Sequence, residues 1–166
     1  MRRILIVALL GFTLGGCDSG ASQSTFRELA LGPPSGFTRT DAQGTVVSVD
    51  AGDWQVSPLY SPASVVWVTV QPSFPNPVAP DGVITLILNV RSGAVVGGLT
   101  AVGYVERPGQ LPDSFILDEV VDARGFVTFS IVPAQHPGFS QGAGLRRVVV
   151  FDGRGEPVTF GDVMIE

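Results

Sequence analysis

The sequence is short of the residues that many catalytic and metal sites require. It has 166 residues but only one Cys and one His, so it can form neither an internal disulfide nor a site built from several Cys or paired His ligands. It has no Lys: its ten basic residues are all Arg, and the formal net charge is −5. Nucleic-acid binding is excluded because phosphate partners require basic surfaces.

Long apolar runs and helical periodicity are also scarce. The N-terminal apolar stretch, residues 4–14, has eleven residues. As a helix it would rise about 16 Å, well short of a hydrocarbon core of about 30 Å, so a permanent transmembrane helix is not expected there. No segment after residue 32 keeps a helical period over ten residues, and the 21 Gly and 13 Pro favour turns.

The N-terminus has the parts of an export signal. Two arginines precede the apolar stretch and two glycines follow it, as in a secretory signal peptide. The tetrapeptide Leu14-Gly15-Gly16-Cys17 resembles the lipobox of bacterial lipoproteins. The resemblance implies that the chain is cut before Cys17 and that the Cys17 thiol carries a diacylglyceryl group. A plain signal peptide with a coincidental Cys is the alternative.

The expected organisation has three parts: a signal peptide at residues 1–16, a lipid-anchored tether at 17–44 and one domain at 45–166. The tether begins with a Ser/Gly stretch and shows no sustained period beyond a possible helical turn near residues 26–31. As flexible coil it would span on the order of 30 Å. The mature chain would keep eight Arg against fifteen acids, a charge of −7, so membrane contact is expected only through acyl chains on Cys17.

Beyond the tether, short runs rich in Val, Ile, Thr, Phe and Trp alternate with Gly, Pro and Asp turns. Apolar residues recur at a period of two, as half-buried strands require. Strands without intervening helices predict an all-β fold, a single antiparallel β-sandwich like immunoglobulin or fibronectin-III domains. The expected strands are 45–49, 54–57, 64–71, 83–90, 99–106, 114–121, 126–132, 146–151 and 158–165.

A proline-rich loop separates two of these strands. Four prolines fall within residues 72–80, so this segment cannot pair centrally in a sheet. Its Phe74-Pro75-Asn76-Pro77 is a possible binding loop; the alternative is that it protects a sheet edge. With the strands that follow, it resembles the β-sandwich sorting domains of type IX-secreted proteins over residues 72–166. The acidic C-terminal Glu166 departs from that family's Lys-rich ending.

Two patterns resemble catalytic sites but lack the context that catalysis needs. Residues 138–142 match the G-x-S-x-G nucleophile elbow around Ser140, yet the chain is too short for an α/β-hydrolase and no His follows. The single His136 lies in a loop before this segment. We therefore predict no catalytic residues, no cofactor and no enzyme activity.

The carboxylates offer only a weak metal candidate. Asp118, Glu119 and Asp122 form the densest acidic group and are a weak candidate for binding calcium through oxygen, since they lack EF-hand spacing. Of the two tryptophans, Trp67 is expected to fill the core between the sheets. Trp54 is the candidate for an exposed, sugar-stacking ring, although a core position is favoured for it too.

The sequence therefore predicts a membrane-anchored lipoprotein of the cell envelope with a non-catalytic β-sandwich. Its expected role is structural, or the binding of another envelope protein or a glycan, through an open sheet edge or the proline-rich loop. The alternative is a sorting or assembly module related to type IX secretion domains.

Overall fold

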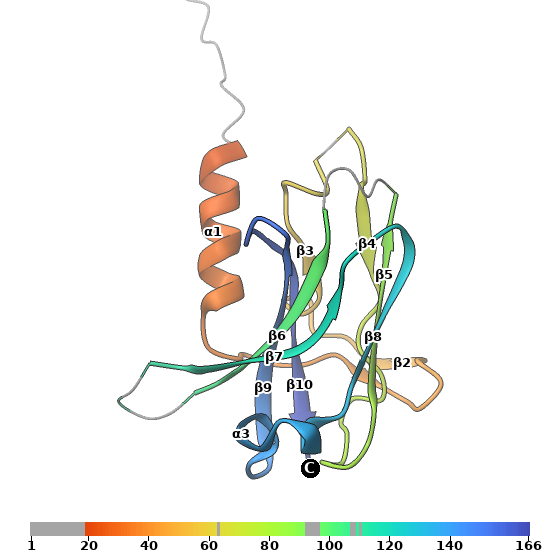
Figure 1. Cartoon of the computed structure of the whole chain (residues 1–166), viewed down its shortest axis with the longest axis vertical. Helices are drawn as coiled ribbons and strands as arrows, with labels where there is room; N and C mark the ends of the chain where they lie inside the picture. Colours follow the sequence, from red (N-terminus) through yellow and green to blue (C-terminus); the bar gives the residue numbers. More distant parts are fainter. Residues whose placement is uncertain (1–18, 63, 92–96, 107–108, 110) are drawn as a thin grey trace, which may run out of the picture.

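The computed structural model, which describes residues 19–62, 64–91, 97–106, 109 and 111–166, contains two facing β-sheets with a helix packed outside one of them (Figure 1). The helical elements are α1 (Ser19–Leu31), the 3₁₀ turn η1 (Pro133–Gln135) and α3 (Pro137–Ser140). The strands are β1 (Arg39–Thr40), β2 (Val46–Ser48), β3 (Gln55–Val56), β4 (Val68–Val70), β5 (Ile84–Val90), β6 (Leu99–Val105), β7 (Asp113–Val120), β8 (Gly125–Ile131), β9 (Gly144–Asp152) and β10 (Pro157–Ile165).

The strands pair in an antiparallel sandwich. One sheet has the order β3-β10-β9-β6-β7, the other β4-β5-β8, and β1 with β2 forms a separate small hairpin. Every paired set of strands is antiparallel, and neither large sheet closes on itself. The order resembles that of immunoglobulin domains, in which strands A, B and E face strands C, F and G. The predicted all-β antiparallel sandwich is confirmed.

The core lies between the two sheets and follows the period of two seen in the sequence. In β5 every second residue is buried, from Ile84 through Val90, and the residues between them are half-buried. β8 repeats this alternation with Val127, Phe129 and Ile131. Leu99, Ala101, Val148, Val150, Val158, Val163 and Ile165 complete the core from the other sheet.

Strands β9 and β10 are buried on both faces, unlike β5 and β8. Val148 and Val150 face the core, whereas Val149 points to the outer face and is also fully buried. Helix α1 covers that outer face. Its Phe26 and Ala30, one helical turn apart, pack with Val149 and Phe160 in a second apolar cluster. The consecutive valines of β9 therefore reflect burial on two sides.

The expectation that residues 17–44 form a flexible tether is wrong for its described part. Residues 19–31 form a helix, and Phe26 is 5% exposed against the sheet. The helix ends before Gly32 and two prolines, which cannot continue it. Residues 39–40 then pair with β2. The sequence signal for this helix is weak, because α1 binds the sheet through only two or three apolar residues.

The proline-rich loop joins both sheets at the end of the sandwich where the chain terminates. Phe74 pairs with Thr85 of β5, and Val78 pairs with Ile165 of β10. Between them, the fully buried Asn76 donates to the carbonyls of Thr38 and Asp162 at 3.1 and 2.9 Å. Its Oδ1 accepts from the amide of Met164 at 2.9 Å. The loop therefore closes one end of the sandwich with its own backbone and one buried amide.

The core position favoured for Trp54 is confirmed, whereas Trp67 lies at the side of the core. Trp67 is only half-buried and packs against the side of the core, so the expectation that it fills the core is wrong. Trp54 is 6% exposed. Its indole lies on Gly161, where a Cβ would come within 2.3 Å of the ring, so only glycine fits beneath it. Trp54 precedes β3 and cannot offer an exposed ring for stacking on a sugar.

Candidate functional site

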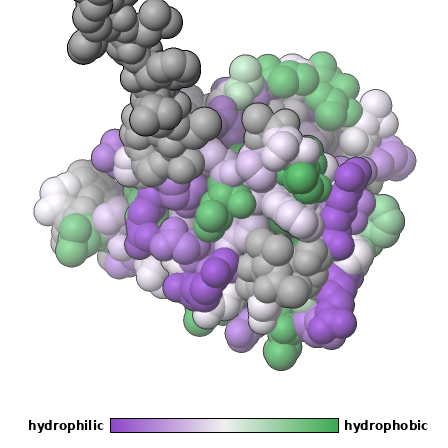
Figure 2. Space-filling view, turned by 90° about the horizontal axis from the view of Figure 1, so that it is seen from above, coloured by the Kyte–Doolittle hydropathy of each residue, from purple (hydrophilic) through white to green (hydrophobic). Residues whose placement is uncertain are grey.

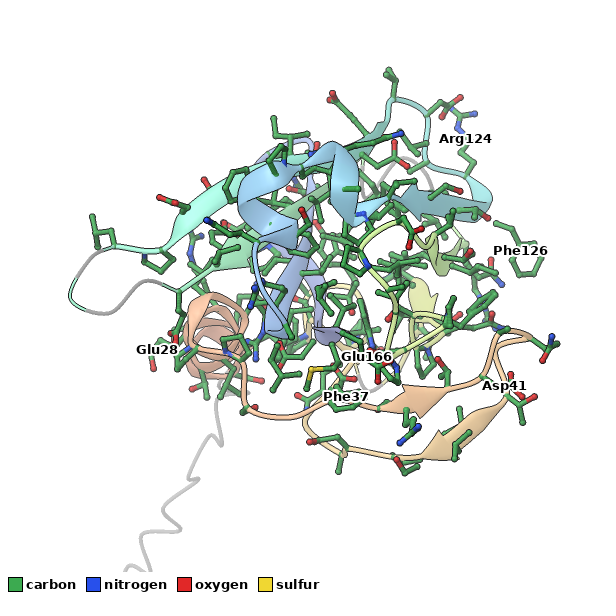
Figure 3. All side chains as sticks on the ribbon, turned by 90° about the horizontal axis from the view of Figure 1, so that it is seen from below. Glu28, Phe37, Asp41, Arg124, Phe126 and Glu166 are labelled. Carbon is green, nitrogen blue, oxygen red and sulfur yellow. The ribbon has the colours of Figure 1, made fainter. Side chains whose placement is uncertain are left out.

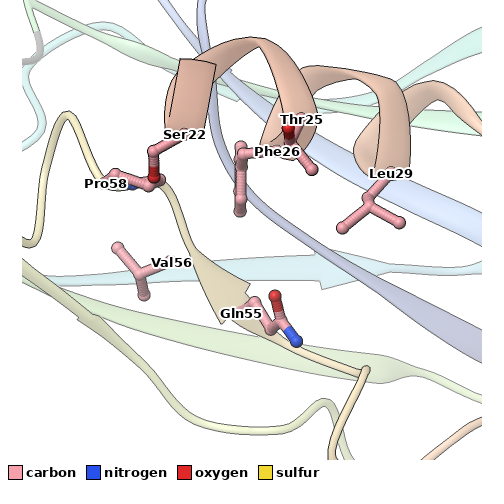
Figure 4. Close-up of a pocket in the computed structure, with 7 residues that line it drawn as sticks. All are labelled: Ser22, Thr25, Phe26, Leu29, Gln55, Val56 and Pro58. Carbon is pink, nitrogen blue, oxygen red and sulfur yellow. The ribbon is translucent and has the colours of Figure 1, made fainter. Parts of the chain in front are cut away.

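Helix α1 and the edge strand β3 enclose a groove, shown in close-up in Figure 4. Its upper part has a volume of about 510 Å³. A second hollow of about 420 Å³ continues toward the C-terminal end of the helix and shares three lining residues with the first: Thr25, Leu29 and Gln55. We call the two together the α1–β3 groove. The upper part is lined by Ser22, Thr25, Phe26, Leu29, Gln55, Val56 and Pro58.

The walls of the α1–β3 groove are mainly apolar, and polar side chains, with Glu28 among them in the lower part, form its rim. Phe26 and Val56 lie on its two sides, and Phe160 lines the lower part. Leu29 projects from the helix and is 53% exposed. Hydroxyl and amide groups of Thr25 and Gln55 supply hydrogen-bonding partners. Such a groove suits an apolar segment with some polar contacts, not a highly charged ligand.

A buried ion pair fixes the lower end of the groove. The Nε of Arg147 lies 2.5 Å from Oδ1 of Asp162, and both side chains are 4% exposed or less. Arg147 also donates to the carbonyls of Leu29 and Pro33 at 2.5 and 3.1 Å. Its guanidinium lies 4.8 Å from the ring centre of Phe160. One charged side chain therefore satisfies the carbonyls that end α1 and ties the helix to the sheet.

A second carboxylate extends this network below the helix. Asp53 accepts from the amides of Asp162 and Thr38 at 2.6 and 2.7 Å. Burial raises the pKa of Asp53 to about 6; the hydrogen bonds from Thr38 and Asp162 lower it less than burial raises it. The amide of Ser35 donates to Asp162 at 2.8 Å. These bonds hold the chain after α1 against β10.

A second polar cluster, formed by Tyr60, Asp152 and Arg154, lies under the turn between β9 and β10. The buried Tyr60 hydroxyl donates to Oδ2 of Asp152 at 2.5 Å, and Arg154 contacts both groups. Burial raises the pKa of Tyr60 well above its usual value. Burial also acts to raise the pKa of Asp152, but the hydrogen bonds from Tyr60 and from the Glu156 and Arg154 amides outweigh it and lower that pKa overall. The cluster anchors the segment that leads from β3 to β4.

The sequence-predicted site residues lie in several places. Cys17 is outside the described residues. Phe74, Pro75 and Pro77 are half-buried. The buried side-chain amide of Asn76 forms its hydrogen bonds to Thr38, Asp162 and Met164 within the sandwich. These contacts give the proline-rich loop a structural role. They leave no group of the Asn76 side-chain amide available to bind a ligand.

The weak metal candidate is not supported. Asp118 accepts from the amides of Glu119 and Ser130, while Asp122 pairs with Arg124 at 2.9 Å. The carboxylates of Asp118 and Asp122 thus have separate partners. Within the described part of the chain, no group of three or more His, Cys, Asp or Glu side chains could hold a metal ion.

Residues 138–140 of the elbow-like segment belong to α3, a short turn of helix. Ser140 donates its hydroxyl to the carbonyl of Pro137 at 3.4 Å. His136 precedes that turn and accepts the Ser140 amide through its backbone carbonyl at 3.0 Å. Phe139 is the buried residue of the turn and packs over Gly103 of β6. The structure accounts for this segment as packing at the end of the sandwich.

No protein-family model matches the chain, and no curated protein matches its sequence. Among the described residues, no helix has the length and apolar character needed to cross a membrane.

Sequence reasoning missed the α1–β3 groove. Its walls come from a helix that was expected to be coil and from a strand of two residues. The one available signal was the spacing of Phe26 and Ala30, which places both on one helical face.

Proposed function

We propose that this protein is a lipid-anchored protein of the cell envelope and that its β-sandwich is a non-catalytic binding module. The observation that carries the proposal is the α1–β3 groove, whose helix begins two residues after the lipobox Cys17. Two or three acyl chains on Cys17 would hold the chain in a membrane, since one chain alone binds only marginally.

The groove favours an apolar segment of another envelope protein as its occupant. Its sides are formed by Phe26, Val56 and Leu29. Two charged residues line its lower part: Arg147, which is already paired with Asp162, and Glu28. A sugar-binding site usually offers an aromatic face for stacking, whereas Trp54 is buried against Gly161. The sides of the groove bury apolar surface, the main source of affinity between proteins.

Labelling with radioactive fatty acid tests the anchor. We expect label on the wild-type protein in its own host and none on Cys17→Ser. Unlabelled wild-type protein in the soluble fraction would contradict the anchor.

Chemical cross-linking in intact cells, followed by purification, tests the groove. We expect Leu29→Glu to lose its cross-linked partner, because a charge at this half-exposed position must be desolvated on binding. Leu111→Glu is the matched control, since Leu111 is 88% exposed and lies outside the groove. Equal cross-linking by both variants would show that the groove is not the binding site. Recovery of an envelope glycan instead of a protein would show that the partner is a glycan.

A further inference from the structure

A group of apolar side chains is exposed at the end of the sandwich where α1 begins. Leu59, Val65 and Val66 are 45, 43 and 37% exposed, and the half-buried Trp67 follows them. We call these four residues the apolar tip. They belong to the connection between β3 and β4. Figure 2 looks down on this end and shows hydrophobic side chains gathered on it.

The apolar tip and the N-terminal turns of α1 lie at the same end of the molecule (Figure 1). Ser57, where the connection starts, donates its hydroxyl to Oε1 of Gln23 at 2.7 Å. Ser22 and Pro58 line the same part of the α1–β3 groove. The C-terminal Glu166 lies at the opposite end, seen from below in Figure 3.

The tip is held firmly by the polar cluster beneath it. The carbonyl of the fully buried Tyr60 accepts from the amides of Trp67 and Val68 at 2.9 and 3.2 Å. The Val65 amide donates to Pro62 at 3.1 Å. These hydrogen bonds hold the backbone on both sides of the exposed valines.

Cationic groups flank the tip although the protein as a whole is acidic. Arg91 is exposed, and its amide donates to the carbonyl of Trp67 at 2.8 Å. The side chain of Arg154 is 64% exposed, pairs with the buried Asp152 at 2.8 Å and reaches the Tyr60 hydroxyl at 3.3 Å. The nearby acid Glu156 is paired with Arg27 at 3.2 Å. Apolar residues with an aromatic ring and arginines around them are the composition found at membrane interfaces.

The short chain between Cys17 and α1 is the argument for what covers the tip. Cys17 precedes Ser19 by two residues, which reach at most about 7 Å. We propose that the apolar tip docks into the phospholipid interface of the membrane that holds the acyl chains of Cys17. The inference rests on the proposed lipid anchor, and it goes beyond the expectation from net charge that the acyl chains make the only membrane contact. It adds that the sandwich sits on the bilayer in one orientation, with the proline-rich loop and Glu166 facing away.

Fluorescence quenching of Trp67 tests the docking. The lipidated full-length protein is reconstituted in vesicles of phosphatidylethanolamine and phosphatidylglycerol that contain brominated phosphatidylcholine. We expect the bromine atoms to quench Trp67, while the Trp67→Phe variant reports the unquenched background of the buried Trp54. Wild-type fluorescence equal to that in bromine-free vesicles would overturn the docking.

Paired substitutions locate the contact. We expect Val65→Asp with Val66→Asp to weaken the quenching about threefold, because interfacial binding scales with buried apolar area. Val47→Asp with Val49→Asp is the control: these valines are 64 and 76% exposed on and beside β2, away from the tip. Should the aspartate pair fail to fold, Val65→Ser with Val66→Ser replaces it. Equal loss in tip and control variants overturns the assignment.

Flotation of the same vesicles separates this inference from the proposed function. Protein that is acylated and floats but shows no Trp67 quenching would refute the docking and leave the anchor standing. Protein without an acyl group that does not float would refute both.

Discussion

The ion pair between Arg147 and Asp162 is the interaction on which the N-terminal segment depends most. Both groups are almost completely buried, and each makes further hydrogen bonds to the backbone of residues 29–36. Burying two charges is costly, and the cost is offset only when the remaining donors and acceptors also find partners. Here the partners are the carbonyls at the end of α1 and the amides that follow it.

Removing one member of this pair leaves the other buried without its counter-charge. We expect Arg147→Met to lower the free energy of unfolding by about 3–5 kcal/mol. Arg124→Met is the control: Arg124 pairs with Asp122 in solvent, with both side chains more than 70% exposed, and its loss should cost less than about 1 kcal/mol. Urea unfolding followed by circular dichroism measures both, and equal losses would contradict a structural role for the pair.

Asp53 makes the stability of the protein depend on pH. Its pKa rises from 3.8 to about 6 on folding, so the folded state binds a proton that the unfolded state has released between these values. This contribution is present below about pH 4 and is lost as the pH rises through about 6. We expect the free energy of unfolding to fall by roughly 2–3 kcal/mol across that range from this group.

Asp53→Asn should remove this fall, although the variant is less stable at every pH because its amide must point a donor at the amide of Thr38 or Asp162. Asp41→Asn serves as the control, because hydrogen bonds, chiefly from Thr45, lower the pKa of Asp41 and its contribution has the opposite sign. Urea titrations at several pH values between 4 and 7 measure the effect. A fall that persists unchanged in Asp53→Asn would assign it to another group.

Among the elements, α1 departs most from what the sequence suggested. The nine expected strands are all present, with ends shifted by up to four residues, because alternation of apolar residues is a strong signal. α1 contributes one buried aromatic ring and one alanine to the outer face of β9 and β10. Two apolar residues are too few to give α1 a periodic pattern over ten residues of its sequence. Their contacts nevertheless bury Val149 and Phe160.

Truncation of Phe26 tests whether α1 is an integral part of the fold. The Phe26 ring lies 5.2 Å from that of Phe160, centre to centre, and we expect Phe26→Ala to cost about 3 kcal/mol. Leu29→Ala, on the same helix but half-exposed, should cost well under half of that. Thermal unfolding compares the two. A flexible tether would predict no loss for either variant.

At the scale of the whole molecule, the helix and both sheets share one structure. β3 and β4 precede residue 72 but pair with β10 and β5, so residues 72–166 are not a self-contained sandwich. The part of the chain that resembles sorting domains therefore needs the preceding residues to complete both sheets. The buried pair of Arg147 and Asp162 joins the N-terminal segment to this unit.

We expect the chain without lipid, made from residue 17 onward with Cys17→Ser, to unfold in a single cooperative transition. Far-ultraviolet circular dichroism reports the sheets and α1, and tryptophan fluorescence reports the surroundings of Trp54. The two urea curves should coincide, and Phe26→Ala should move both by the same amount. A first transition that removes only the helical signal would show that α1 unfolds independently.

The sequence by itself determined the strands and the all-β class, because alternation of apolar residues depends only on neighbours along the chain. It also shows the lipobox pattern at Cys17, whose processing is still a prediction. Only the tertiary structure decided which tryptophan is buried, which groups form hydrogen bonds with the Asn76 side-chain amide, and that α1 forms the wall of a groove. Each of these depends on residues more than 30 positions apart that meet only when the sheets pack: Phe26 with Phe160, Trp54 with Gly161, and Asn76 with Asp162.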